Sequence, residues 1–215
     1  MSKVLSVVLA MGVGAVLAAP GNVFADGKAT FGAKKCGSCH STDAAKASDK
    51  APNLSYAGSK YQAAWLEAWL AKPTPVRQVK WGTLTKGTTS HDALSAGEAK
   101  EVAAYLATLT DAKVAKGAVP AGEAKGAAKV QGKLLFEKKQ GCYGCHLVKG
   151  SGGKVTGGFT GPSLAEAGAR LQADWIVAYL KDPNHFFPET MSPNYSKRFN
   201  DNEMKTIAQY MMSFK

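Results

Sequence analysis

The chain has 215 residues, which is enough for one large domain or two small ones. Lysine and arginine together number 27 against 16 acidic residues, giving a formal net charge of +11. The basic residues are scattered and accompany no recognisable nucleic-acid-reading module, so the charge does not indicate nucleic-acid binding. It favours long-range attraction to acidic protein partners or to anionic membrane faces.

Residues 1–25 have the pattern of a secretory signal peptide. Lys3 supplies a short positive region, residues 4–19 are apolar, and Val23-Phe24-Ala25 forms a small-residue cleavage site. Cleavage near Ala25 would place the mature protein in the periplasm. An uncleaved signal would instead anchor the chain in the membrane, but an apolar run of about 16 residues is short for a membrane span.

The pattern C-x-x-C-H occurs twice, at Cys36–His40 and at Cys142–His146. It is the attachment signature of a c-type haem, in which two thiols bond to the porphyrin and the histidine ligates the iron. A zinc site or a redox dithiol also uses C-x-x-C pairs, but two pairs 106 residues apart fit one compact zinc site poorly. All four cysteines belong to the motifs, so none remains for a disulfide or a thiolate ligand. The sequence therefore predicts two covalently attached haem c groups, held by Cys36, Cys39, His40, Cys142, Cys145 and His146.

The two motifs lie within a longer duplication. Ala51-Pro52-Asn53-Leu54 matches Gly161-Pro162-Ser163-Leu164 at an offset of 110, and Trp65–Pro73 matches Trp175–Pro183 at the same offset. We therefore predict two domains, over 26–110 and 131–215. Residues 111–130 are rich in alanine, glycine and lysine, and are expected to form a flexible linker.

Each repeat has the pattern of the same helices, with no competing strand pattern. A short helix carrying Phe31 or Phe136 precedes the motif, and a glycine-rich loop follows it, over 150–158 in the second repeat. A middle helix ends before Pro73 or Pro183, where proline cannot continue it. The last helix begins with Ser95-x-x-Glu98 or Asn200-x-x-Glu203, a capping pattern. The expected fold class is all-α, with two small helical domains that each wrap around one haem.

At this point the chain resembles the class I (mitochondrial-type) cytochrome c family, as a di-haem tandem. The resemblance rests on both C-x-x-C-H motifs, the proline-containing loop and the closing helix with its aromatic residue. It implies that the backbone carbonyls of Pro52 and Pro162 orient the two motif histidines. It also implies that the first and last helices of each domain cross, with Tyr105 and Tyr210 in the contact.

The sixth iron ligand of the second domain is predicted to be Met191. The segment Met191-Ser192-Pro193 resembles the axial methionine segment of the family, although there the proline usually follows the methionine directly. The other methionines lie in the last helix, where Met204 and Met211 are on its core face. His185 is an alternative ligand but fits a surface or loop histidine better.

The first domain has no methionine after the signal, so its sixth ligand must be of another kind. His91 lies in the matching loop and is the only histidine of that half besides His40, which favours bis-histidine ligation. Counting back from the last helix places Lys86 opposite Met191, so Lys86 or Lys80 stays open as a ligand, as does an open or water-bound iron. A lysine can bind iron only after it loses a proton, and its pKa is about 10.4. Imidazole is therefore the favoured iron ligand at neutral pH.

These assignments predict a periplasmic electron-transfer protein that is not an enzyme. Methionine raises a haem potential relative to histidine, so the first haem is expected to be the lower-potential centre. Redox partner proteins with acidic docking surfaces, and peripheral association with a membrane complex, are the expected interactions. Two alternatives stay open: a peroxidase-like or sulfur-compound-oxidising haem enzyme whose active site is the first haem, and an electron-transfer subunit of a membrane oxidoreductase.

Overall fold

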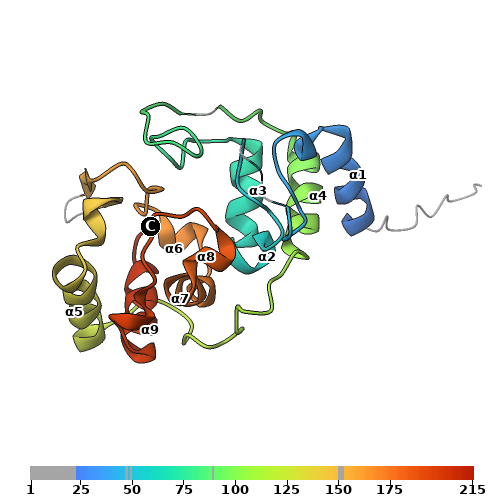
Figure 1. The fold of residues 1–215 in the computed structure, drawn as a ribbon. Coiled ribbons are helices and arrows are strands. Elements are labelled where there is room, and N and C mark those ends of the chain that lie inside the picture. The colour runs from blue at the N-terminus through green and yellow to red at the C-terminus, as the bar shows by residue number, and fades with distance from the viewer. Residues whose placement is uncertain (1–22, 47, 49, 89, 150–152) are drawn as a thin grey trace, which may run out of the picture.

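The computed structural model describes residues 23–46, 48, 50–88, 90–149 and 153–215. Most of the segment predicted as a signal, residues 1–22, lies outside them. The described chain forms two helical domains side by side, with α2 and α6 toward the middle (Figure 1). The all-α prediction is confirmed.

The described residues of the first domain form α1 (Val23–Ala33), the 3-10 turn η1 (Cys36–Ser38), α2 (Ala57–Lys60), α3 (Ala63–Ala71) and α4 (Ala96–Ala107). The second repeats this order with additions: α5 (Gly126–Leu134), the π-helical turn η2 (Leu135–Lys139), η3 (Cys142–Gly144), β1 (Leu147–Lys149), β2 (Val155–Gly157), α6 (Ala167–Arg170), α7 (Ala173–Lys181), α8 (Pro183–Phe186), η5 (Tyr195–Lys197) and α9 (Asp201–Met211). The last helix of each domain begins with the predicted capping box, at Ser95 and at Asn200.

The first and last helices of each domain cross at a glycine. A Cβ at Gly27 would lie 2.8 Å from Cβ of Tyr105, and one at Gly132 would lie 2.6 Å from Cβ of Tyr210. Both crossings therefore need a residue without a side chain. Each is flanked by an edge-to-face ring pair, Phe31–Tyr105 at 5.6 Å and Phe136–Tyr210 at 5.7 Å between centroids. The family-based expectation for Tyr105 and Tyr210 is confirmed.

The expectation that no strand forms is wrong in one place. Strands β1 and β2 pair antiparallel within and beside the glycine-rich loop, with Leu147 opposite Gly157 and Lys149 opposite Val155. Three-residue strands show too few alternations for a period of two to stand out, and β2 is exposed throughout.

The expectation of a flexible linker is also wrong. Residues 111–125 pack along the second domain, where Val114, Val119 and Ala124 are buried. The carboxylate of Asp174, at the start of α7, accepts hydrogen bonds from the backbone N–H groups of Gly117 and Val119 at 2.6 and 2.8 Å. Composition indicated a mobile segment, but these distant contacts fix it, and α5 begins at Gly126 inside the predicted linker.

The two domains meet through matching segments, residues 60–62 and 170–172. The N–H of Gln62 donates to the carbonyl of Arg170, and the N–H of Gln172 donates to the carbonyl of Lys60, both at 2.9 Å. Tyr61 and Leu171 form an antiparallel bridge between these bonds. Because segments 60–62 and 170–172 correspond to each other at the repeat offset of 110 residues, the interface has the reciprocal character of a two-fold contact.

At the same interface, each domain places one buried cation over an aromatic ring of the other. Lys60 is 8% exposed, and its Nζ lies 4.8 Å from the ring centroid of Trp175 in the other domain. Arg170 is 5% exposed, and its guanidinium carbon lies 5.9 Å from the ring of Trp65. A cation over an aromatic face is attracted by the ring quadrupole, so each domain supplies one cation and one ring.

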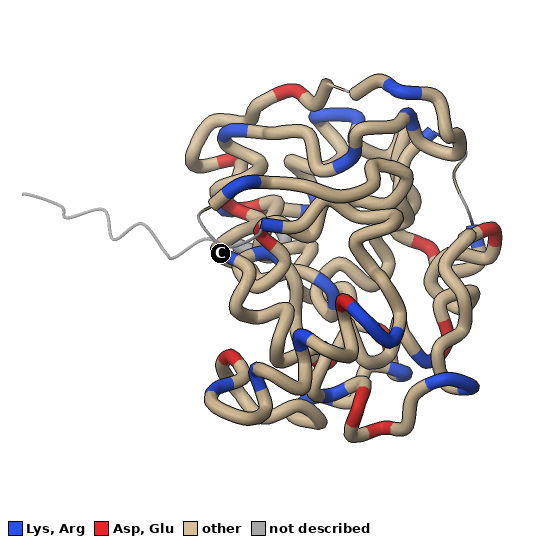
Figure 2. The backbone as a smooth tube through the Cα atoms, turned by 90° about the vertical axis from the view of Figure 1, so that its left-hand side faces the viewer, with Lys and Arg blue, Asp and Glu red and all other residues tan. Residues whose placement is uncertain are grey.

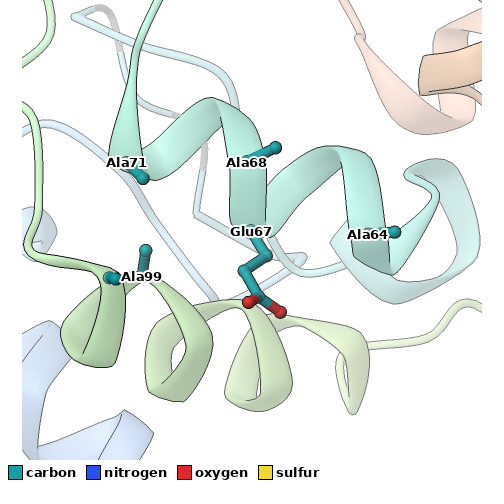
Figure 3. Close-up of a pocket in the computed structure, with 6 residues that line it drawn as sticks. Ala64, Glu67, Ala68, Ala71 and Ala99 are labelled. Carbon is teal, nitrogen blue, oxygen red and sulfur yellow. The ribbon is translucent and has the colours of Figure 1, made fainter.

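Away from the interface, a recess lies between α3 and α4. Five alanines and Glu67 line it, and the Glu67 side chain extends from α3 toward α4 (Figure 3). It contains none of the predicted haem-site residues. Within the described part of the chain, no helix combines the length and apolar character needed to span a membrane.

Candidate haem sites

Each C-x-x-C-H motif forms a tight turn that follows a residue in the left-handed region. Lys35, with φ 55°, precedes Cys36, and Gly141, with φ 62°, precedes Cys142. The N–H groups of His40 and His146 donate to the carbonyl of the first cysteine of their motif, at 3.0 and 3.1 Å. The turn thus brings both cysteines and the histidine together. Left-handed conformation costs a residue with a side chain about 1–2 kcal/mol, so Lys35 is held in a strained conformation.

The two motif histidines are held in the same way. Nδ1 of His40 lies 2.8 Å from the carbonyl oxygen of Pro52, and Nδ1 of His146 lies 2.7 Å from that of Pro162. Because a carbonyl only accepts, Nδ1 carries the proton in both rings and Nε2 keeps a free lone pair. Burial lowers the pKa of both imidazoles, which favours the neutral form that binds iron.

The cysteines of each motif differ in burial. Cys36 and Cys142 are half-buried, whereas Cys39 and Cys145 are exposed, and no disulfide joins them. Burial raises the pKa of the Cys142 thiol to about 12 and also raises the pKa of Cys36. Before haem attachment these two sulfurs therefore remain protonated near neutral pH.

Gly161 lies directly against the second motif histidine. A Cβ at this position would come 2.6 Å from Nδ1 and 2.9 Å from Nε2 of His146. The glycine therefore lets the loop that carries Pro162 close over the imidazole ring.

Gly161→Ala is therefore expected to displace the His146 ring. Forcing an atom into this contact should destabilise the protein by about 1–3 kcal/mol and change the spectrum of the second haem alone. Gly97→Ala in α4 is the control, because a Cβ there meets nothing within 4 Å. Denaturant unfolding and visible spectra measure both effects. A wild-type spectrum and wild-type stability in Gly161→Ala would contradict the role given to this contact.

In the first site, the structure places the imidazole ring of His91 beside that of His40. Their ring centroids are 6.4 Å apart, and His91 also packs at 4.9 Å from the ring of Trp69. His91 is exposed, and its Nδ1 hydrogen-bonds to the carbonyl of Asp92 at 2.9 Å. Nδ1 is thus the protonated nitrogen here too, and Nε2 has the free lone pair.

The alternative lysine ligands have other surroundings. Lys86 pairs with Val79 in an isolated bridge, and its Nζ lies 4.7 Å from the ring of Phe159 in the second domain. The backbone N–H of Lys80 donates to Thr85 within the same turn. The Lys86 side chain is therefore directed to the neighbouring domain.

In the second site, Met191 lies in the loop between α8 and η5 and is 70% exposed. The preceding residue anchors this loop: the Thr190 hydroxyl lies 3.0 Å from the Tyr179 hydroxyl and accepts from the N–H of Ser192 at 3.1 Å. The other candidates are engaged elsewhere. Met204, Met211 and Met212 are buried in and beside α9, and Nε2 of His185 lies 2.8 Å from the Asp111 carboxylate.

The buried polar atoms show whether the residues suit a haem. Among the described residues, two buried side-chain donors have no hydrogen-bond partner, Nε of Arg77 and Nε1 of Trp175. A buried donor without an acceptor costs about 1–3 kcal/mol, and a haem carries two propionate carboxylates that can accept. Together with free cysteines and neutral histidines, these donors fit a covalently attached haem.

Two helical domains, each with a C-x-x-C-H turn and a histidine held by a proline carbonyl, define a c-type haem protein. In a comparison with protein families, the family described as Cytochrome c matches the chain twice, over residues 24–110 and 130–215. The chain therefore belongs to the cytochrome c family, as a tandem of two domains that each bind one covalently attached haem c with its iron. No curated protein and no solved structure matches it significantly.

Membership of this family brings a general function with it. Cytochrome c domains carry electrons through their haem and exchange them with redox partners, and such domains are commonly exported.

Sequence reasoning missed three residues at the sites. Lys35 could not be found because nothing marks a lysine for the left-handed region, although Gly141 at the matching position was a hint. Trp175 was recognised only as a helix residue, and Arg77 was not recognised at all. Arg77 could have been noticed because arginine is rare in this chain: the 27 basic residues include three arginines, Arg77, Arg170 and Arg198.

Proposed function

We propose that the protein is a periplasmic di-haem electron carrier with unequal haems, the first ligated by His40 and His91 and the second by His146 and Met191. The observation that carries this proposal is the 6.4 Å separation of the His40 and His91 rings. Imidazole nitrogens bind divalent transition metals at about 2 Å, so two imidazoles on opposite sides of one iron have centroids roughly 6 Å apart. The two rings are therefore spaced as a bis-histidine pair.

For the second haem, the support comes from the elimination of other ligands. The methionines of α9 are buried in the core and His185 is bound to Asp111, whereas Met191 is exposed in a loop anchored to α7 through Thr190 and Tyr179. Among the described methionines of this domain, Met191 is thus the one whose thioether is not buried in the core.

A bound haem supplies a one-electron iron couple. The chain sets the difference between the two sites through its own donors, because thioether ligation raises the potential relative to imidazole. The second domain is therefore expected to hold the electron at equilibrium, and the first to be the entry side. A redox titration that resolves two separate potentials tests this proposal, and two equal potentials would contradict it.

The basic surface supports partners with acidic docking surfaces. Lysines and arginines are distributed over both domains rather than gathered in one place (Figure 2). Such a surface attracts acidic partners at long range without selecting a contact patch. Association that weakens strongly with rising ionic strength is the expected behaviour.

One observation favours a catalytic alternative at the first haem. His91 is exposed; besides His40, its ring contacts Trp69, and its Nδ1 hydrogen-bonds to the carbonyl of its own neighbour Asp92. A ligand held this way could leave and open the iron to a small substrate. A high-spin fraction of the first haem in the resting protein would favour this alternative over a carrier with two saturated irons.

A further inference from the structure

The loop between α3 and α4 of the first domain reaches the haem site of the second. The N–H of Ser163 donates to the carbonyl of Val76 at 2.7 Å, and Ser163 directly follows Pro162, whose carbonyl holds His146. Further along the loop, the ring of Trp81 lies 5.8 Å from that of Phe187. The first domain therefore contributes to the surroundings of the second motif histidine.

Arg77 is the charged residue at this point of the loop. It is half-buried, its guanidinium carbon lies 5.3 Å from the ring of Trp81, and its buried Nε has no hydrogen-bond partner. Arginine is always charged and its planar fork suits a carboxylate. An anion beside this guanidinium would accept from the unpaired donor and balance its charge.

Among the residues that the structure describes, no carboxylate forms an ion pair with Arg77. The ion pairs among the described residues involve other cations, and none includes Arg77, Lys60 or Arg170. Arg170 instead donates to the carbonyl of Ser163 at 2.5 Å, and Ser163 donates to the carbonyl of Val76, the residue before Arg77. The interface therefore gathers buried cations that form no ion pair with a carboxylate of the described residues.

We propose that Arg77 of the first domain binds a propionate of the haem attached to the second domain. The Nε–H, which is unpaired in the protein, donates to the carboxylate, and the guanidinium charge neutralises it. The second haem site is then completed in trans, and its redox equilibrium depends on the first domain. This inference rests on the haem of the second domain but not on Met191 as its ligand.

The expected consequence is a lower potential of the second haem when the charge is removed. A nearby cation stabilises the reduced haem, which has one more electron, and its effect is large where burial limits screening. We expect Arg77→Gln to shift the reduction equilibrium of the second haem at least tenfold toward the oxidised form, or about 59 mV for one electron. The first haem should shift less.

An EPR-monitored redox titration of the holoprotein follows each ferric haem separately and tests this. Arg198→Gln is the matched control, because it removes the same charge from an exposed position of the second domain. A shift in Arg77→Gln no larger than in this control, or a larger shift of the first haem, would overturn the proposal.

Reduced-minus-oxidised infrared difference spectra provide a second readout that does not depend on the size of the shift. Arg77→Lys keeps the charge but loses the Nε donor and the planar fork, so the propionate carboxylate band should move in this variant even if Arg77→Gln does not fold. An unchanged band in Arg77→Lys would also overturn the proposal. Failure of the Met191 assignment would appear instead as wild-type ligation in Met191→Ala, with the Arg77 effects intact.

Discussion

His91→Ala is expected to convert the first haem from low spin to high spin and to leave the second unchanged. The imidazole of His91 lies 6.4 Å from that of His40, and removing it leaves one strong axial donor on that iron. About half of the ferric low-spin EPR signal should therefore be lost. Added imidazole should restore it, because a free ligand can occupy the position that the side chain leaves.

Lys86→Ala is the control for this experiment. Lys86 occupies the position matched by counting from the last helix, but its Nζ stacks on Phe159 of the other domain. We expect this variant to keep both low-spin signals. Retention of the first haem signal in His91→Ala, together with its loss in Lys86→Ala, would assign the ligand to lysine and contradict the bis-histidine proposal.

Met191→Ala is expected to lower the potential of the second haem. Axial ligands set haem potentials over a range of about 0.8 V, so loss of the thioether should exceed a tenfold change in the equilibrium constant, or about 59 mV. Met191→His should lower it as well, toward the potential of the first haem, while keeping the iron low spin. A spectroelectrochemical titration measures both variants.

Met204→Leu separates ligation from packing in the same domain. Met204 is 1% exposed in α9, and leucine has a similar volume, so this change should cost less than about 1.5 kcal/mol and leave the potential in place. If Met191→Ala keeps the wild-type potential and spectrum of the second haem, Met191 is not its ligand.

Local patterns made much of the fold predictable. The capping boxes at Ser95 and Asn200 depend on residues three positions apart, and both form as predicted. The middle helices end at Ala71 and Lys181, before the prolines at 73 and 183. The haem motifs are equally local, because two cysteines and a histidine lie within one turn.

The features that sequence reasoning missed depend on residues far apart in the chain. The linker is fixed by Asp174, which lies 57 and 55 residues beyond Gly117 and Val119, the residues it accepts from. No pattern within 111–130 indicates that contact. The pairing of residues 60–62 with 170–172 joins two polar segments that carry no strand pattern. The unpaired donor of Arg77 becomes visible only when the two domains are placed together.

The site was predicted unevenly for the same reason. Spacing identified the two motifs, and the resemblance to the cytochrome c family implied that the carbonyls of Pro52 and Pro162 orient the histidines, which is where the structure has them. His91 could not be chosen over Lys86 by alignment, because the first-domain loop is longer than its counterpart. The ring distance to His40 supplies an argument that sequence could not.

The central claim, that two domains of one origin hold haems with different ligands, is tested most directly by near-infrared magnetic circular dichroism of the oxidised wild-type protein. The charge-transfer bands in this region depend on the axial ligand pair of each low-spin iron. We predict two distinct bands of equal weight, one for an imidazole–imidazole haem and one for an imidazole–thioether haem. A single band that accounts for both haems would contradict the claim.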